Sequence, residues 1–122
     1  MDGNQSLLTE GGFLLNGDQA IILLEKLTEY ALHLNHPTGG HKALLFRDLL
    51  GFTGEDAFDL IAVIRQGILG TSASPGRVNA DGARFRVDIE VTGKTGKTFV
   101  VRTGWIYRPG RTLPRLTTVF IR

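Results

Sequence analysis

The sequence predicts an α+β domain, with helices in its first half and an antiparallel meander of three or four strands in its second half. Apolar residues recur at helical spacing through residues 24–69, and from residue 84 onward they alternate with polar ones. Elements segregated along a chain in this way are typical of folds in which helices cover one face of an antiparallel sheet. We expect a single domain over residues 14–122, preceded by a flexible tail over residues 1–13.

Two helices are expected between residues 20 and 51, after a short strand at residues 20–22. The first carries apolar residues at helical spacing up to Leu34. It stops before Pro37, because proline disfavours helical geometry at the residue that precedes it. The second spans about residues 42–50 and ends at Gly51, since glycine is common just past the end of a helix.

A third helix is predicted from a capping box at residues 53–56 to about Leu69. Residues 70–82 are rich in Gly, Ser, Asn and Pro, which indicates a loop. One face of this helix is expected to carry Ala57, Phe58, Ile61, Ile64 and Ile68.

The second half of the chain is predicted to form the sheet. In RFRVDIEV (84–91) apolar and charged residues alternate, which is typical of a half-buried strand. TGKTGK makes a hairpin turn, and two further strands follow at residues 98–107 and 115–122. Alternation groups Val101, Thr103 and Trp105 on one side, with Arg102, Gly104 and Ile106 on the other. In the last strand it groups Leu116 with Thr118 and Phe120, and Arg115 with Thr117 and Val119.

Charge is distributed unevenly along the chain. Residues 1–76 hold four Lys/Arg against nine Asp/Glu, whereas residues 77–122 hold ten against three. A basic region of this kind favours an anionic partner, and nucleic acid is the first candidate. The alternative is that the basic part docks on the acidic part of its own domain.

Several functional classes lack support in the sequence. There is no cysteine, which excludes disulfides and thiolate metal sites. No apolar run approaches the roughly 18 residues that cross a bilayer, and the acidic N-terminus does not resemble a secretory leader. GxGxxG, P-loop and GxSxG motifs are missing. We expect a soluble, cytoplasmic protein that acts without a metal or another cofactor.

Metal-independent RNA cleavage fits the available side chains best. In that reaction the ribose 2′-OH attacks the adjacent phosphorus, so it needs proton transfer and cations that stabilise the phosphorane. His36 can act as base or acid because the pKa of histidine lies near neutrality. Lys42 and strand arginines can stabilise the developing charge, and threonine hydroxyls can hold phosphate oxygens. Trp105 can stack on a base.

A resemblance to a known family rests on two stretches, EKLTEYAL…HPTGGHKALLFRDLLGF and VRTGWIYRPGRTLPRLTTVFI. They resemble a bacterial domain family of unassigned function with H-P-x-G-x-x-K-A and W-I…P-R-L-x-T motifs, over residues 14–122. The late motif is similar to the closing strands of the barnase/EndoU/colicin-nuclease/RelE-like superfamily of metal-independent ribonucleases, many of which are toxins. The chain departs from the family pattern at two positions: it has Gly104 where relatives usually have an apolar residue, and Thr117 where they often have valine.

The resemblance implies a toxin-type endoribonuclease acting on RNA such as tRNA or mRNA, with a cognate antitoxin or immunity protein as a possible partner. Positions carried over from the motifs are His36, Gly39, Lys42, Thr103, Trp105, Pro114, Arg115 and Thr118. The candidate catalytic residues are therefore His36, Lys42, Thr103, Arg115 and Thr118. Candidate substrate-binding residues are Trp105, Arg102, Thr117 and His41. The alternative function is a non-catalytic module that binds nucleic acid or another protein.

Overall fold

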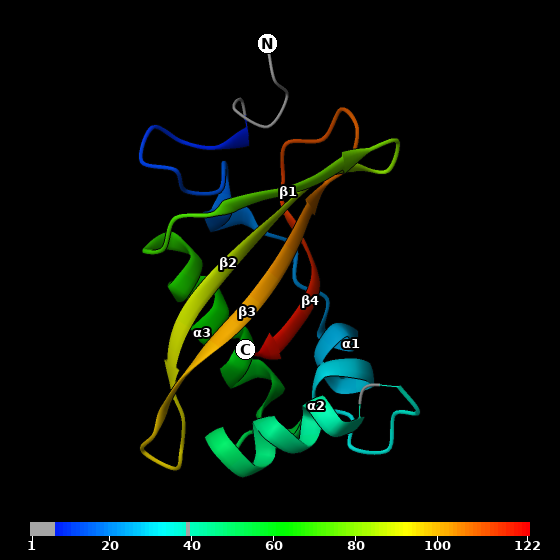
Figure 1. The fold of residues 1–122 in the computed structure, drawn as a ribbon, viewed down its shortest axis with the longest axis vertical. Coiled ribbons are helices and arrows are strands. Elements are labelled where there is room, and N and C mark those ends of the chain that lie inside the picture. Colours follow the sequence, from blue (N-terminus) through cyan, green and yellow to red (C-terminus); the bar gives the residue numbers. More distant parts are fainter. Residues whose placement is uncertain (1–6, 39) are drawn as a thin grey trace.

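The computed structural model describes residues 7–38 and 40–122 and shows an α+β fold, which confirms the predicted class (Figure 1). Its four strands form one antiparallel sheet in the order β1-β2-β3-β4, so each strand pairs with its neighbour in sequence. The strands are β1 (Ser74–Asn79), β2 (Gly82–Thr92), β3 (Thr98–Tyr107) and β4 (Arg115–Ile121). In Figure 1, α3 lies behind the sheet, α1 lies beside β4, and α2 lies below the end of β4.

The first two helices each consist of a short α-helical segment that continues as a π-helical turn. They are α1 (Leu24–Lys26) with Leu27–Ala31, and α2 (Gly40–Leu45) with Phe46–Leu50. The first ends earlier than predicted, and the predicted strand at residues 20–22 is reduced to a bridge between Ile21 and Arg115. The second ends as predicted at Gly51, whose φ of 74° lies in the left-handed region that favours glycine.

Helix α3 (Ala57–Leu69) follows a 3-10 turn at Gly54–Asp56. The Asp56 carboxylate accepts a hydrogen bond from the Thr53 backbone N–H (2.9 Å), as the predicted capping box requires. The buried face consists of Ala57, Leu60, Ile64 and Ile68. Phe58 was predicted on this face but is 72% exposed, because it follows Ala57 by a single residue and so projects to the side of the stripe.

The core lies between α3 and the face of the sheet that holds Phe85, Val87, Ile89 and Val91. All four alternate with exposed or half-exposed residues along β2, which confirms the predicted pattern. Val101, Thr103 and Trp105 lie opposite them on β3 and face the core as well. Arg84, Arg86, Arg102 and Gly104 therefore lie on the other face, which the helices leave open.

A β-bulge interrupts the regular pairing of β3 with β4. Trp105 pairs with Leu116, and Gly104 pairs with Thr118, so Thr117 is an extra residue without a direct partner on β3. Leu116 consequently faces the core, whereas Thr118 and Phe120 face the open side together with Arg115. The alternation predicted for this strand was wrong, because the bulge shifts its phase by one residue.

Two further expectations need correction. Residues 70–82 were predicted to be a loop, but β1 lies within them as an edge strand whose residues are all exposed. The tail does not extend to residue 13, because Leu7 and Leu8 pack against the core and Ala73 donates a backbone hydrogen bond to Gly12 (2.8 Å). The remainder of the predicted tail, residues 1–6, lies outside the described residues. None of the helices described is long and apolar enough to cross a membrane.

Candidate functional site

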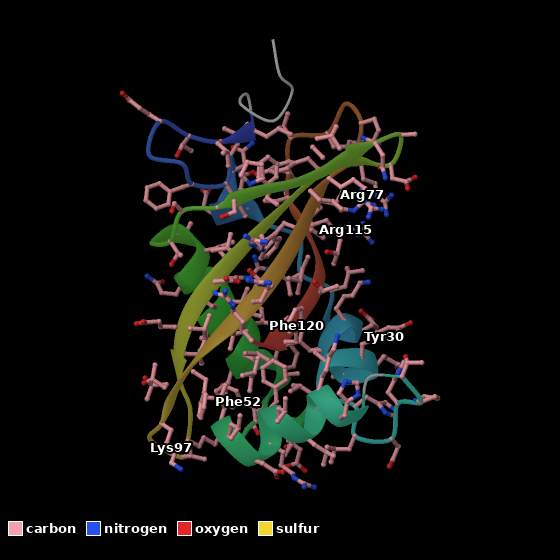
Figure 2. The ribbon with its side chains drawn as sticks, viewed as in Figure 1. Tyr30, Phe52, Arg77, Lys97, Arg115 and Phe120 are labelled. Atoms are coloured by element: carbon pink, nitrogen blue, oxygen red, sulfur yellow. The ribbon has the colours of Figure 1, made fainter. Side chains whose placement is uncertain are left out.

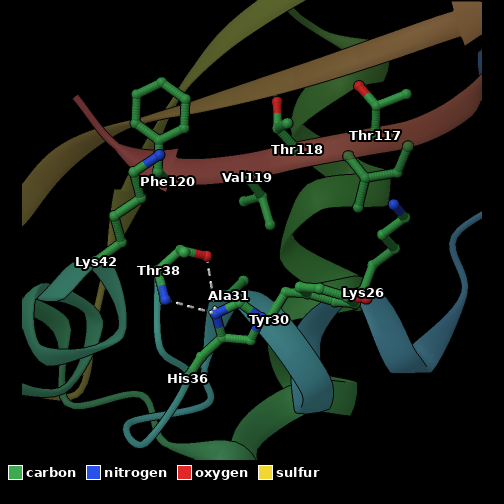
Figure 3. A pocket seen from close by; sticks show the side chains of 11 residues that line it. Lys26, Tyr30, Ala31, His36, Thr38, Lys42, Thr117, Thr118, Val119 and Phe120 are labelled. Atoms are coloured by element: carbon green, nitrogen blue, oxygen red, sulfur yellow. Dashed lines mark hydrogen bonds between the residues drawn. The ribbon is translucent and has the colours of Figure 1, made fainter. Parts of the chain in front are cut away.

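A pocket of about 210 Å³ lies where the first two helices meet the outer edge of β4 (Figure 3). Its helical side contributes the polar residues Lys26, Tyr30, His36, Thr38 and Lys42. The strand contributes Thr117, Thr118 and Phe120. Among the described residues, those that line it include two lysines, a histidine and three threonines but no Asp or Glu, so the pocket is suited to an anion.

His36 is held by the turn that precedes α2. Its carbonyl accepts a hydrogen bond from the Gly40 N–H (3.0 Å), and its Nδ1 accepts one from the Thr38 N–H (3.2 Å). The Thr38 hydroxyl lies 3.2 Å from the same nitrogen. The imidazole also packs against the Tyr30 ring, with 5.0 Å between the ring centres. A backbone N–H can only donate, so this contact favours the neutral tautomer that carries its proton on Nε2.

Both lysines of the pocket lie over aromatic rings. Lys42 Nζ lies 4.7 Å from the centre of the Phe120 ring, and Lys26 Nζ lies 5.7 Å from the centre of the Tyr30 ring. Within the part of the chain that the structure describes, neither ammonium forms an ion pair with a carboxylate. The rings therefore orient the two cations without neutralising them, and both charges remain available to a ligand.

Thr117 and Thr118 present two hydroxyls above the backbone of Gly104. A Cβ at Gly104 would lie 2.5 Å from Thr118 Oγ1 and 3.1 Å from Thr117 Oγ1, so a larger residue would displace at least the first of them. In Figure 3 both hydroxyls point to the side of β4 that carries the Phe120 ring, whereas His36 and Tyr30 lie beyond the other side of the strand. The pocket thus extends around the edge of β4.

Four of the predicted site residues meet in this pocket: His36, Lys42, Thr117 and Thr118. They come from the turn before α2, from its first turn, and from the bulge in β4. The two positions at which the chain departs from the resembled motif, Gly104 and Thr117, meet at this same bulge.

Thr103 and Trp105 are not part of the pocket. Both have 0% of their surface exposed, and they face the core. Thr103 Oγ1 donates to the Val87 carbonyl (2.7 Å), and Trp105 Nε1 donates to Thr103 Oγ1 (2.8 Å). A phosphate or a base cannot reach either side chain in this fold, so their assignment to the site was wrong. Their role is to satisfy polar atoms within the core.

Arg102, Arg115 and His41 also lie outside this pocket. Arg102 forms a two-pronged ion pair with Asp88 (2.9 and 3.0 Å) on the open face of the sheet. This hydrogen-bonded guanidinium holds the pKa of the Asp88 carboxyl below its ordinary value, against the opposing effect of burial.

Arg115 lies opposite Ile106 on that face and lines a separate pocket with Arg108 and Arg111. His41 is exposed on α2 and does not line the pocket. Gly39, which the motif also marks, lies outside the described residues.

Four polar or aromatic residues of the pocket were missed from the sequence: Lys26, Tyr30, Thr38 and Phe120. Tyr30 belongs to the apolar stripe predicted for the first helix, although its spacing of four residues from Lys26 places the two side chains together on that helix. Thr38 follows His36 by two residues, the spacing at which turn side chains contact the backbone. Phe120 could be assigned to one side of β4, but alternation did not indicate which side was open.

The fold and this pocket define a small α+β domain with a cationic pocket at the edge of its sheet. A family model described as a domain of unknown function (DUF6883) matches residues 13–122. The chain therefore belongs to that family. No curated protein and no solved structure matches the chain. In residues 7–38 and 40–122, no group of three or more His, Asp or Glu side chains is placed to hold a metal ion.

Proposed function

We propose that the chain is a metal-independent endoribonuclease, of the toxin type that its motifs resemble. The observation that carries this proposal is the carboxylate-free pocket that joins His36, Lys42 and Thr118. Cleavage of RNA by its own 2′-OH requires a group that transfers protons and cations that stabilise the phosphorane. All of these groups can be reached from the single edge of β4.

His36 transfers the proton in this scheme. The 2′-oxygen loses its proton to Nε2 and forms a bond to phosphorus, while the bond from phosphorus to the 5′-oxygen breaks. The leaving oxygen takes a proton from an ammonium group of the pocket or from water. A ring that accepts a proton on Nε2 must hold its other proton on Nδ1, so the reaction requires Nδ1 to give up the hydrogen bond from the Thr38 N–H and to donate to the Thr38 hydroxyl instead. The products are a 2′,3′-cyclic phosphate and a free 5′-hydroxyl.

The remaining groups of the pocket bind the substrate. The Lys42 ammonium offsets the charge that develops on the phosphorane, and the Thr118 and Thr117 hydroxyls donate to phosphate oxygens. Tyr30 is 54% exposed and Phe120 is partly exposed, so these two rings replace Trp105 as surfaces on which a base stacks.

A second candidate function is a non-catalytic module that binds RNA or an anionic protein. The contact between the Thr38 N–H and Nδ1 favours it, because the neutral ring then carries an N–H rather than a lone pair at Nε2. In that case His36 is a donor to phosphate and a support for its turn. For the ribonuclease the expected partners are RNA and a cognate antitoxin or immunity protein, in the cytoplasm. For the non-catalytic module the partner is a nucleic acid or another protein, for which this chain would itself be the antitoxin-type or immunity-type partner.

A cleavage assay with two variants of His36 separates these functions. Purified protein is incubated with total RNA or tRNA in EDTA, and the product ends are analysed. In His36→Asn the side-chain oxygen takes the place of Nδ1, so the acceptor for Thr38 remains while the far side of the ring, including Nε2, is removed. His36→Ala removes both. The proposal predicts that both variants lose cleavage by about 10²-fold or more, and that Lys42→Met loses it to a comparable extent.

The matched control is Lys97→Met, which removes an exposed lysine in the β2–β3 hairpin. It should cleave RNA as the unmodified chain does. Cleavage that survives in His36→Asn but fails in His36→Ala would assign His36 to the turn alone. Absence of cleavage at every protein concentration, together with salt-sensitive RNA binding, would favour the non-catalytic module.

A further inference from the structure

The open face of the sheet carries a second cationic depression next to the pocket. Its floor is Gly104, which lacks a side chain, and its walls are the two threonines of the bulge and the arginines Arg77, Arg84 and Arg86. Thr117 and Thr118 line both this depression and the pocket that holds His36. The two hollows are therefore adjacent, with the hydroxyl pair between them.

The strand register places the parts of this depression in one row across the sheet. Arg86 pairs with Gly104, and Gly104 pairs with Thr118, so the guanidinium and the hydroxyl stand on either side of the missing side chain. Neighbouring strands lie about 4.8 Å apart, so the side chains that flank Gly104 arise about 10 Å from one another. Because the Thr118 hydroxyl leans over Gly104, a phosphate group bound here lies above the glycine, with Arg86 on one side and this hydroxyl on the other.

The three arginines of the depression are not fully neutralised. Arg84 is positioned by the Asn79 side chain (3.1 Å) and lies 3.9 Å from the exposed Asp81. Among the described residues, Arg77 and Arg86 form no ion pair. Asp88, the next carboxylate along this face, is already held by Arg102 and by Arg122 (3.2 Å).

We infer that this depression is a second phosphate subsite, and that it binds the backbone of single-stranded RNA next to the nucleotide held in the pocket. The inference rests on the proposed function, because it takes RNA as the ligand of that pocket. The RNA strand passes over the edge of β4 at Thr117 and Thr118 and continues across Gly104 toward Arg86. A duplex is disfavoured, since the hydroxyl pair serves both hollows and leaves space for one backbone. The chain then discriminates substrates by length and by strandedness.

Binding of RNA analogues that cannot react tests this inference without relying on catalysis. The probes are 2′-O-methyl oligonucleotides, in which the attacking hydroxyl is blocked: a dinucleotide with one phosphodiester, and a hexanucleotide. The hexanucleotide should bind at least about tenfold more tightly. Arg77→Gln/Arg86→Gln should remove most of that advantage and reduce the salt slope by about 0.7 for each phosphate that no longer has a guanidinium partner. Dinucleotide binding should change by about twofold or less.

A control with the same loss of charge is Arg47→Gln/Lys97→Gln. Both of its side chains are exposed, and Figure 2 shows Lys97 at the end of the sheet remote from Arg77. This control should bind the hexanucleotide nearly as the unmodified chain does. Any of three results would overturn the subsite. The first is that both double variants weaken hexanucleotide binding equally, and the second is that the hexanucleotide binds no more tightly than the dinucleotide. The third is that poly-glutamate displaces the dinucleotide and the hexanucleotide equally well.

The two proposals fail in different ways. If RNA is not cleaved but hexanucleotide binding still depends on Arg77 and Arg86, the subsite stands and the proposed reaction fails. If RNA is cleaved and Arg77→Gln/Arg86→Gln leaves both the rate and the affinity unchanged, the reaction stands and the subsite fails.

Discussion

Lys42 Nζ lies 4.7 Å from the centre of the Phe120 ring, so the ammonium of α2 is held against the open side of β4. Helix α2 and β4 are far apart in sequence, and this contact joins the two halves of the pocket (Figure 3). Its electrostatic origin is the negative face of the aromatic ring, which orients the cation without neutralising it.

Replacement of Phe120 by leucine should weaken anion binding while it preserves the apolar contact of the strand. An exposed cation–π contact contributes about 0.5–1 kcal/mol, so we expect a two- to fivefold loss of affinity for inorganic phosphate in calorimetry. Phe58→Leu, in an exposed phenylalanine of α3, is the control and should bind as before. Equal affinities in both variants would show that Phe120 does not position Lys42 for a ligand.

Replacement of Thr103 by valine should destabilise the protein. The change removes the acceptor of the Trp105 N–H and the donor to the Val87 carbonyl, both in the core. An unsatisfied buried polar group costs about 1–3 kcal/mol, which urea unfolding can measure. Thr98→Val, at an exposed hydroxyl pair with Thr92, should change the free energy of unfolding by only about 0.5 kcal/mol or less. A loss of RNA cleavage in folded Thr103→Val would restore a catalytic role for this residue.

Replacement of Gly104 by alanine should affect the ligand site more than the fold. The new Cβ would displace the Thr118 hydroxyl, which can rotate away at little cost to the strand. We expect phosphate affinity to fall severalfold with only a small change in the urea midpoint. Gly54→Ala is the matched control, because nothing lies within 4 Å of its Cβ position. Unchanged affinity in Gly104→Ala would exclude the hydroxyl pair from the site.

Replacement of Asp88 by asparagine should alter the pH dependence of stability. The folded pKa of Asp88 is lowered, chiefly by its hydrogen bond from Arg102, so its contribution is complete above the unfolded value near 3.8 and is lost as pH falls below it. Asp88→Asn should lower the urea midpoint at pH 7 and flatten the decline in acid. It should also strengthen RNA binding at low salt, because Arg102 and Arg122 lose their carboxylate. Asp48→Asn, at an exposed aspartate, is the control and should leave both the pH dependence of stability and RNA binding unchanged.

The fold class followed from periodicity, because a change from helical spacing to alternation is a property of the chain itself. β2 was the most regular of these patterns and was confirmed along its length. β1 was missed because SPGRVN contains proline and glycine and buries none of its side chains. An edge strand of this kind is held by pairing with β2 rather than by a hydrophobic pattern.

The site was predicted only in part, because sequence patterns identify residues of one segment but not how separate strands pair. His36 and Lys42 could be placed together because eight residues of one motif contain both. Thr103 and Trp105 were correctly assigned to a common side of β3, but alternation does not reveal which side meets the core. The bulge at Thr117 depends on pairing between two strands, so no single-strand pattern could indicate it.

Thr117 is a one-residue insertion in a strand that would otherwise alternate without fault, with Arg115 outward, Leu116 inward, Thr118 outward and Val119 inward. Deletion of this residue would leave every core partner in its present register and would remove one hydroxyl from the edge of the sheet. The surface chemistry of this domain and the packing of its interior can therefore change independently, at the level of a single codon.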